Sequence, residues 1–337
     1  YGCEGLRGHK RREGLLIGKW DELIRIFSKD IRTILKRTCV DFENVQEIRL
    51  RIQGPLLMIQ NNRECYITPE GKLSKSPGDA FLVSRRDLKE TLEYISSYSL
   101  YAFEEEIKQG FITIQGGHRI GLAGKTVSDN QGIRSMKFIS FVNVRLSHEV
   151  KGCANQVMPY LYEKGEFLHT LILSPPRSGK TTLLRDMIRQ ISDGTGFNGG
   201  LTVGVVDERS EIGACYQGEP QNKLGIHTDI LDCCPKALGM MMMIRTMSPQ
   251  VIAVDEIGSR EDLAAMEYVM NCGCKLIATV HGSSMEDIRQ KPVLGKLLQE
   301  QWFERHVVLE GKKRPGYVAR ICDSKGKELA LSGREGL

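Results

Sequence analysis

The sequence lacks any apolar run that approaches the roughly 18 consecutive residues needed to span a lipid bilayer. Its first residues are polar and basic, so they do not predict a signal peptide, and we do not expect export. Internal repeats and low-complexity tracts are also missing. These absences favour an ordinary globular protein over the membrane-spanning, secreted and repeat classes.

The ten cysteines lack the spacing of a metal-binding motif. Cys233 and Cys234 are adjacent, and Cys272 and Cys274 are separated by one residue. Neither pair has the two-residue gap of a zinc knuckle. The pattern predicts reduced thiols in a reducing cytosol.

The length of 337 residues favours two domains, and 41% apolar with 26% charged residues is typical of a globular chain. The net charge is +5, and residues 1–40 hold ten Lys and Arg against five Asp and Glu, so their excess equals that of the whole chain. A basic N-terminus can meet anionic lipid, nucleic acid or an acidic partner. It is equally typical of a solvated helix face.

Periodicity predicts a smaller α+β domain over residues 1–148. Apolar residues near a 3.6 period predict a helix over residues 20–36, and Ser84 as a cap predicts another from Arg86 to Lys108. Short strands are predicted at 45–51, 55–59, 63–67, 110–115, 118–123 and 138–146.

Residues 149–337 have a different pattern of apolar segments. Apolar strands are predicted at 169–173, 201–206, 250–254 and 275–280, alternating with helical segments. This alternation predicts a parallel sheet covered by helices. The segments His306–Glu310 and Tyr317–Cys322 flank a turn sequence and predict a terminal hairpin.

The segment Leu171–Leu184 is an apolar strand, a loop of small residues, Gly-Lys-Thr and an apolar helix. Loop amides and a helix N-terminus stabilise phosphate oxygens. Lys180 would place its charge on the β- and γ-phosphates, and the Thr181 hydroxyl would bind Mg²⁺. Ser174 stands where this motif has glycine, so the loop entry is expected to differ slightly. The predicted ATP-binding residues are Ser174, Pro175, Pro176, Arg177, Ser178, Gly179, Lys180, Thr181 and Thr182.

A second strand, Val251–Val254, ends in two carboxylates. Parallel strands end at the same edge of a sheet, where ligands bind. We expect Asp255 to hold Mg²⁺, through water, and Glu256 to orient or deprotonate the attacking water. The spacing from the phosphate loop makes the pair a strong indication of nucleotide hydrolysis.

Two further strand ends carry candidate side chains. Thr279 or His281 would hydrogen-bond the γ-phosphate or the attacking water, unless His281 is a turn residue. The segment Val205–Glu211, which includes Glu208, is either a second acidic box that positions water or metal, or a solvated salt-bridge cluster.

The order of these motifs resembles the traffic ATPases of type II and type IV secretion and pilus retraction. Arg245–Ile257 matches their arginine and Glu-bearing segment, and Gly273–Gly282 matches their histidine box, with departures at Asp255 and Gly282. The resemblance implies a homo-oligomer, expected to be a hexamer, in which Arg119 and Arg145 of one subunit reach a neighbour's nucleotide. The alternative, which is equally open, is that these arginines are exposed strand ends that pair with acidic residues.

A closer resemblance, to the stage III sporulation AA family of endospore-forming bacteria, covers nearly the whole chain. Its segments here are Glu47–Arg51, Gly116–Lys125, Phe141–Leu146, Ser174–Asp186, Asp232–Lys236 and Ser248–Gly258. The resemblance implies an ATPase of the mother-cell cytoplasm, peripheral on the outer forespore membrane. It also implies, as partners, membrane proteins of the stage III sporulation complex between mother cell and forespore.

Together these patterns predict an α/β protein with a RecA-like P-loop ATPase core, preceded by the smaller α+β domain. The predicted function is ATP hydrolysis with Mg²⁺ that powers or remodels the sporulation complex. One alternative is a nucleic-acid-stimulated ATPase, but no basic stretch is interleaved with aromatic residues, and no specific nucleic acid is expected. The other is a scaffold or nucleotide-gated switch without hydrolysis.

Overall fold

The computed structural model describes residues 18–97, 103–129, 132–176, 178–195, 199–310 and 316–329. The chain divides into two compact units, Tyr1–His148 and Glu149–Leu337. Within the described ranges, no helix is both long enough and apolar enough to cross a membrane.

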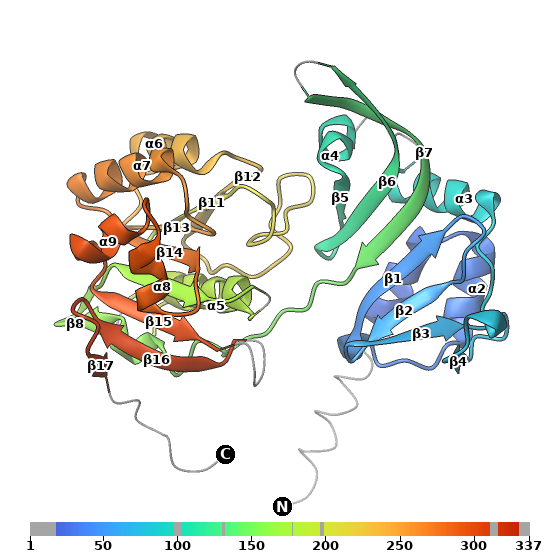
Figure 1. Ribbon diagram of the computed structural model, residues 1–337, viewed down its shortest axis with the longest axis horizontal. Coiled ribbons are helices and arrows are strands. Elements are labelled where there is room, and N and C mark those ends of the chain that lie inside the picture. The colour runs from blue at the N-terminus through green and yellow to red at the C-terminus, as the bar shows by residue number, and fades with distance from the viewer. Residues whose placement is uncertain are drawn as a thin grey trace, which may run out of the picture. The chain divides into compact units, whose positions relative to one another are not determined.

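The first unit contains an antiparallel sheet in the order β4-β3-β2-β1-β7-β6-β5 (Figure 1). Its strands are β1 (Val45–Arg51), β2 (Leu57–Gln60), β3 (Arg63–Ile67), β4 (Leu73–Ser74), β5 (Phe111–Ile114), β6 (His118–Asp129) and β7 (Gly132–Arg145). Its helices are η1 (Ile24–Ile26), α2 (Lys29–Arg37), η2 (Phe42–Asn44), η3 (Pro77–Asp79), α3 (Arg85–Ile95) and α4 (Glu104–Gln109).

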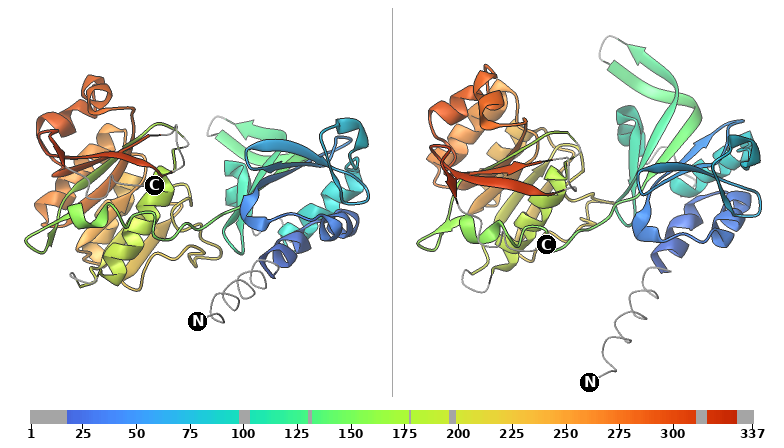
Figure 2. Two further views of the ribbon diagram at one scale, coloured as in Figure 1. Left: turned by 90° about the horizontal axis from the view of Figure 1, so that it is seen from below. Right: turned by 60° about the horizontal axis from the view of Figure 1, so that its bottom comes forward.

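One face of this sheet forms a core with the helices. Ile48 and Leu50 alternate along β1 with the more exposed Arg49 and Arg51, as expected for a strand buried on one side. Figure 2 shows α2 and α3 along the buried face, where their apolar side chains join the same cluster. The six predicted strands of this unit are confirmed, and β6 and β7 extend further than predicted.

Both long helices predicted for this unit were wrong in extent. The first is interrupted before α2, because Ser28 adopts an extended conformation and its hydroxyl accepts the amide of Ile31 as an N-cap. The second ends at Ile95, the last residue of α3, and Ser97 has a positive φ of 48°. Apolar periodicity continued across both breaks, so it could not reveal them.

The second unit contains a sheet in the order β12-β11-β13-β14-β10-β15-β16-β17. The strands of this unit are β8 (Tyr162–Glu163), β9 (Glu166–Phe167), β10 (Thr170–Ser174), β11 (Val203–Asp207), β12 (Thr228–Asp232), β13 (Val251–Val254), β14 (Lys275–His281), β15 (Arg305–Leu309), β16 (Val318–Asp323) and β17 (Glu328–Leu329). Its helices are η5 (Met158–Tyr160), α5 (Lys180–Asp193), α6 (Lys236–Thr246), α7 (Arg260–Asn271), α8 (Met285–Gln290) and α9 (Gly295–Gln299).

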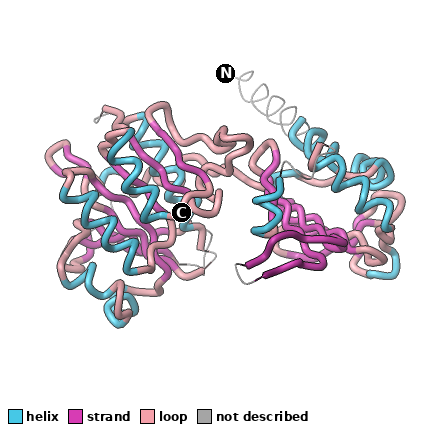
Figure 3. The backbone as a smooth tube through the Cα atoms, turned by 90° about the horizontal axis from the view of Figure 1, so that it is seen from above, coloured by secondary structure: helices cyan, strands magenta, loops and turns pink. Residues whose placement is uncertain are grey.

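Strands β12, β11, β13, β14, β10 and β15 are parallel, and all of them except the edge strand β12 are largely buried on both faces. Helices lie on both sides of this part of the sheet (Figure 3). Alternate residues of β10 enter different cores: Leu171 and Leu173 pack with α6 to α9, and Ile172 packs with α5. The four predicted parallel strands are confirmed. The sequence analysis missed β12, whose two aspartates interrupt its apolar pattern.

The terminal hairpin prediction is also confirmed by the antiparallel pairing of β15 with β16. Strand β15 additionally pairs in parallel with β10, so it joins the hairpin to the main sheet. Residues 311–315, within the predicted turn, lie outside the described residues.

The buried Asp87 links two helix caps in the first unit. Its carboxylate accepts the amide of Ser84 at 2.9 Å, and the hydroxyl of Ser28 donates to it at 2.8 Å. We expect Asp87→Ala to lower the free energy of unfolding of this unit by about 2 kcal/mol, because two caps lose a buried partner.

The chain has two tryptophans, Trp20 in the first unit and Trp302 in the second. Urea unfolding followed by Trp20 fluorescence in a Trp302→Phe background therefore reports on the first unit. Lys89→Ala, which removes one partner of an exposed ion pair on α3, is the matched control and should change stability by less than about 0.5 kcal/mol. Equal effects of the two substitutions would contradict the linking role of Asp87.

Candidate functional site

Three neighbouring parallel strands end at one edge of the large sheet. In the β10–β14 pair Ser174 lies opposite His281, and in the β13–β14 pair Val254 lies opposite Ala278. The residues that follow β10 and β13 are therefore brought together with the end of β14. This juxtaposition follows from parallel pairing, as the sequence predicted.

The segment after β10 leads directly into a helix start. Gly179 occupies the N-cap of α5 with a φ of 83°, and this cap position makes no side-chain hydrogen bond to the first turn. A helix start carries unpaired amides and partial positive charge. The Ser178 hydroxyl oxygen is buried and has no hydrogen-bond partner among the described residues. These donors fit an anion such as a phosphate group.

The Lys180 side chain is only 6% exposed. Its Nζ lies 2.5 Å from Glu256 Oε1, 3.6 Å from Asp255 Oδ1 and 3.3 Å from His281 Nε2. A buried ammonium group needs a counter-charge, because desolvating an unpaired charge costs several kcal/mol. Glu256 supplies that counter-charge most directly.

Thr279 supports both carboxylates that follow β13. Its hydroxyl donates to Asp255 Oδ1 and accepts the backbone amide of Glu256 at 2.9 Å. Glu256 has a φ of 55°, an uncommon conformation for a residue with a side chain. The other Asp255 oxygen accepts the Thr181 hydroxyl at 2.7 Å, so the predicted metal-binding pair is in contact.

The two oxygens of Glu256 face different cations. His281 Nε2 lies 2.8 Å from Oε1, on the same oxygen as Lys180, whereas Arg209 Nη1 lies 2.6 Å from Oε2. Burial raises the pKa of the Glu256 carboxyl, but the hydrogen bond from Lys180 and the charge of Arg209 outweigh it, so the pKa is lowered. The carboxylate form is therefore favoured near neutral pH.

The acidic segment after β11 lies at the same edge. Asp207 is buried and accepts the backbone amides of residues 211–213 at 2.8–2.9 Å. Burial raises the pKa of Asp207 to about 6, although these amides oppose the shift. Glu208 pairs with Lys236, and it lines a small pocket with Asp255 and Glu256.

The remaining predicted loop residues have local roles. The Ser174 carbonyl accepts the amide of Gly282, which fixes β10 against the end of β14. Pro175 and Pro176 form the loop before the helix, and the Thr182 carbonyl accepts the thiol of Cys153. Arg177 lies outside the described residues.

Sequence reasoning did not predict the observed contacts of two contributors to this site. Thr279, one of two candidates for a hydrogen bond to the γ-phosphate or the attacking water, is fully buried beneath Asp255 and Glu256. Arg209 was not singled out, because an arginine between acidic residues is typical of a solvated surface. Its position at the end of a neighbouring strand was the available signal.

Arg119 and Arg145, the predicted arginines of the first unit, are direct partners across β6 and β7. Arg145 is 60% exposed, with its Nε 3.5 Å from Glu47 Oε1, and the Arg119 guanidinium lies 3.6 Å from the centroid of the Phe111 ring. Each arginine therefore already has a neighbour on the face of the sheet away from the helices.

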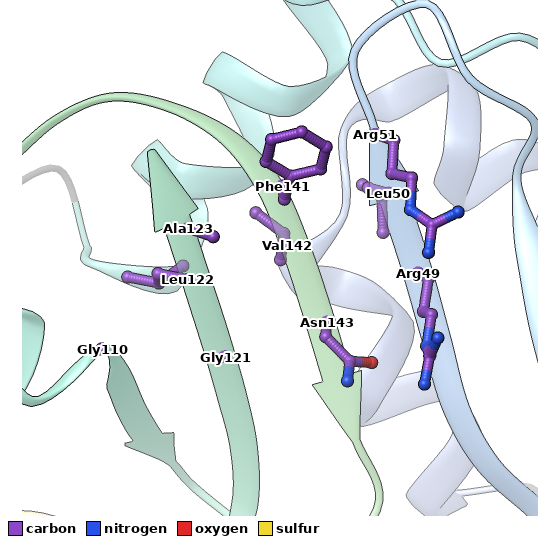
Figure 4. Close-up of a pocket in the computed structure, with 10 residues that line it drawn as sticks. All are labelled: Arg49, Leu50, Arg51, Gly110, Gly121, Leu122, Ala123, Phe141, Val142 and Asn143. Carbon is purple, nitrogen blue, oxygen red and sulfur yellow. The ribbon is translucent and has the colours of Figure 1, made fainter. Parts of the chain in front are cut away.

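A hollow of about 380 Å³ continues along the strands from this pair. Figure 4 shows Arg49 and Arg51 on β1 and Phe141 and Asn143 on β7 around it. Asn143 lies opposite Gly121, the next position on the same face as the arginine pair. The missing side chain of Gly121 leaves that part of the face open.

Among the described residues, no group of three or more His, Cys, Asp or Glu side chains could hold a metal ion alone. A magnesium ion at Thr181 and Asp255 would therefore need further oxygens. Mg²⁺ commonly keeps several waters and binds through one or two protein oxygens and substrate phosphates. The Thr181–Asp255 contact fits such an ion only together with a phosphate ligand.

Comparison with solved structures shows the fold class. The chain superimposes on the ATPase DotB of Yersinia pseudotuberculosis with a TM-score of 0.54 and 13% identity, covering 84% of this chain and 75% of that chain. It superimposes on the pilus retraction motor PilT, solved with bound ADP, with a TM-score of 0.52 and 12% identity, covering 79% and 74%. This confirms a RecA-like core with a separate, smaller N-terminal domain.

Sequence comparison shows the family. Residues 17–329 match the family model described as sporulation stage III, protein AA. Stage III sporulation protein AA of Bacillus subtilis (strain 168) is 41% identical over 286 residues, which are 85% of this chain and 89% of that protein. The chain therefore belongs to the stage III sporulation protein AA family.

Proposed function

We propose that this protein binds ATP with Mg²⁺ and hydrolyses it at the edge formed by β10, β13 and β14. The observation that carries the proposal is the contact of Lys180 with Glu256 beside the Thr181–Asp255 pair. A buried cation, an open helix start and two carboxylates are the parts that phosphoryl transfer requires. The unpartnered Ser178 hydroxyl supports a phosphate ligand at the same place.

Each residue has a distinct task in this proposal. The amides of Gly179 to Thr182 and the ammonium group of Lys180 bind phosphate oxygens. Thr181 and Asp255 hold Mg²⁺, which neutralises charge on the β- and γ-phosphates when it is bound. Glu256 would accept a proton from the attacking water, and His281, which is exposed beside it, would sense the γ-phosphate.

Nucleotide binding would exchange one counter-charge of Lys180 for another. In the structure, the ammonium group of Lys180 is stabilised by Glu256 at 2.5 Å. Phosphate oxygens carry more charge, so Lys180 would leave Glu256 for the nucleotide. That exchange would leave His281 as the described contact of Glu256 Oε1 and would give a water molecule the place of the ammonium group there, which links ATP binding to activation of the base. Glu208, held by Lys236, would act from the second acidic segment by positioning water.

The biological setting comes from the family. We infer that the ATPase acts as a homo-oligomer, expected to be a hexamer, in the mother-cell cytoplasm at the outer forespore membrane. Its partners would be membrane proteins of the stage III sporulation complex, which hydrolysis would power or remodel. Arg119 and Arg145 would extend from one subunit toward a neighbour's nucleotide.

The catalytic role of Glu256 has a direct test. Glu256→Gln should still bind ATP but hydrolyse it at least about a hundredfold more slowly, because the amide cannot accept the proton of the attacking water. ATP turnover and the affinity for a fluorescent ATP analogue should be measured together. Glu267→Gln, an exposed substitution on α7, is the matched control. An unimpaired rate for Glu256→Gln would instead assign the base to Glu208 or Glu211.

The proposed action of Arg119 and Arg145 on a neighbour predicts rescue between subunits. Lys180→Ala protein should have no turnover, and each arginine variant to Ala should be slower by about 10³-fold if the guanidinium stabilises the transferred phosphoryl group. Mixing Lys180→Ala with either arginine variant creates some interfaces that retain both groups. We therefore expect partial recovery of turnover in the mixture.

The control for rescue is Lys180→Ala mixed with Glu256→Gln, in which both defects lie in the same site and each subunit's own site stays damaged. Recovery should be absent there. Wild-type rates of hydrolysis for Arg119→Ala and Arg145→Ala alone would show that these side chains only stabilise the sheet, Arg119 through Phe111 and Arg145 through Glu47.

A further inference from the structure

Arg209 contacts Glu256 from the side opposite Lys180. Its Nη1 lies 2.6 Å from Glu256 Oε2, whereas Lys180 lies 2.5 Å from Oε1. The two cations therefore hold different oxygens of one carboxylate. Only the Lys180 contact would be lost to a bound phosphate, so the Arg209 contact can persist throughout a cycle.

The loop that carries Arg209 is fixed from within. Three amides of residues 211–213 donate to the buried Asp207, and the Ser210 hydroxyl accepts the amide of Cys215. Ser210 is itself buried with a positive φ of 52°. The loop is therefore wrapped around Asp207, and Arg209 projects from a rigid base rather than from a loose surface segment.

Strand pairing sets this loop beside Glu256. Strands β11 and β13 are adjacent and parallel, with Val206 opposite Val254. The segments that follow them, which contain Arg209 and Glu256, leave the sheet at the same level. The contact thus depends on the register of two buried strands and not only on two side chains.

We propose that Arg209 is a positioning residue for Glu256: it holds Oε2 so that Oε1 faces the attacking water once Lys180 has moved to phosphate. This inference rests on the proposed ATPase activity. Without Arg209, and after the loss of Lys180, the His281 ring on Oε1 would be the remaining described contact of the Glu256 carboxylate, and no described residue would hold Oε2. A misplaced base slows the chemical step without weakening substrate binding.

Exposure is the main argument against this role. The Arg209 side chain is 60% exposed, and ion pairs between exposed groups contribute little to stability. Glu256 is less exposed, at 21%, and a positioning effect acts on rate rather than on stability. Kinetics, and not unfolding, is therefore the measurement that separates positioning from a neutral surface contact.

The test compares wild type, Arg209→Ala, Arg209→Lys, Glu256→Gln and the Arg209→Ala/Glu256→Gln double variant, in steady-state and single-turnover ATP hydrolysis. Arg209→Ala should lower kcat about tenfold or more with little change in KM. Arg209→Lys should restore part of the loss. In the Glu256→Gln background, removing Arg209 should have no further effect, because the residue acts through Glu256. Arg320→Ala, an exposed arginine on β16, is the matched control and should be unchanged.

Several results would overturn the inference. An unchanged kcat would make Arg209 a neutral surface residue, and a raised KM with unchanged kcat would make it a phosphate contact. An equal loss in the Glu256→Gln background would show that Arg209 does not act through Glu256. Absence of turnover in the wild type would contradict the proposed function itself, whereas wild-type turnover with any of these outcomes overturns only the role of Arg209.

Discussion

The buried ammonium group of Lys180 is the constraint around which this site is built. Its position at the start of α5 takes it out of water, so a carboxylate must lie within contact distance to keep the folded state favourable. Glu256 meets that need, and its left-handed backbone is held by Thr279 on the neighbouring strand β14. The stability of this edge of the sheet therefore depends on this contact, and under the proposed function the readiness of Glu256 to act as the base depends on it as well.

The parallel sheet makes that contact possible. Because β10 and β13 both pair with β14, the loop after β10 and the two acids after β13 leave the sheet at one edge. Adding β11 on the outer side of β13 brings Arg209 to the same edge. Four strands that are far apart in the sequence therefore each bring charged or polar side chains to this edge. Within the smaller unit, the arginine pair lies on the face of the sheet that the helices leave uncovered.

Much of this fold and site could be predicted from local sequence patterns. The sequence predicted the strand, loop and helix around Lys180 and also the strand before Asp255. In both places an apolar run of strand length ends in residues typical of a phosphate or metal site. The helix breaks at Ser28 and Ser97 were not, since apolar periodicity continues through both. The support from Thr279 and the contact of Arg209 were also missed. They depend on strand order and register, which no local pattern specifies, and the roles of Arg119 and Arg145 stay predictions.

The central claim is that the Lys180–Glu256 pair is the nucleotide-free state of an ATP site. The most direct measurement is a crystal structure with Mg²⁺ and a non-hydrolysable ATP analogue. The account predicts that Lys180 Nζ leaves Glu256 for phosphate oxygens, that Thr181 and Asp255 lie at the metal, and that Glu256 faces a water molecule. A nucleotide bound at another place, with Lys180 still paired to Glu256, would contradict it.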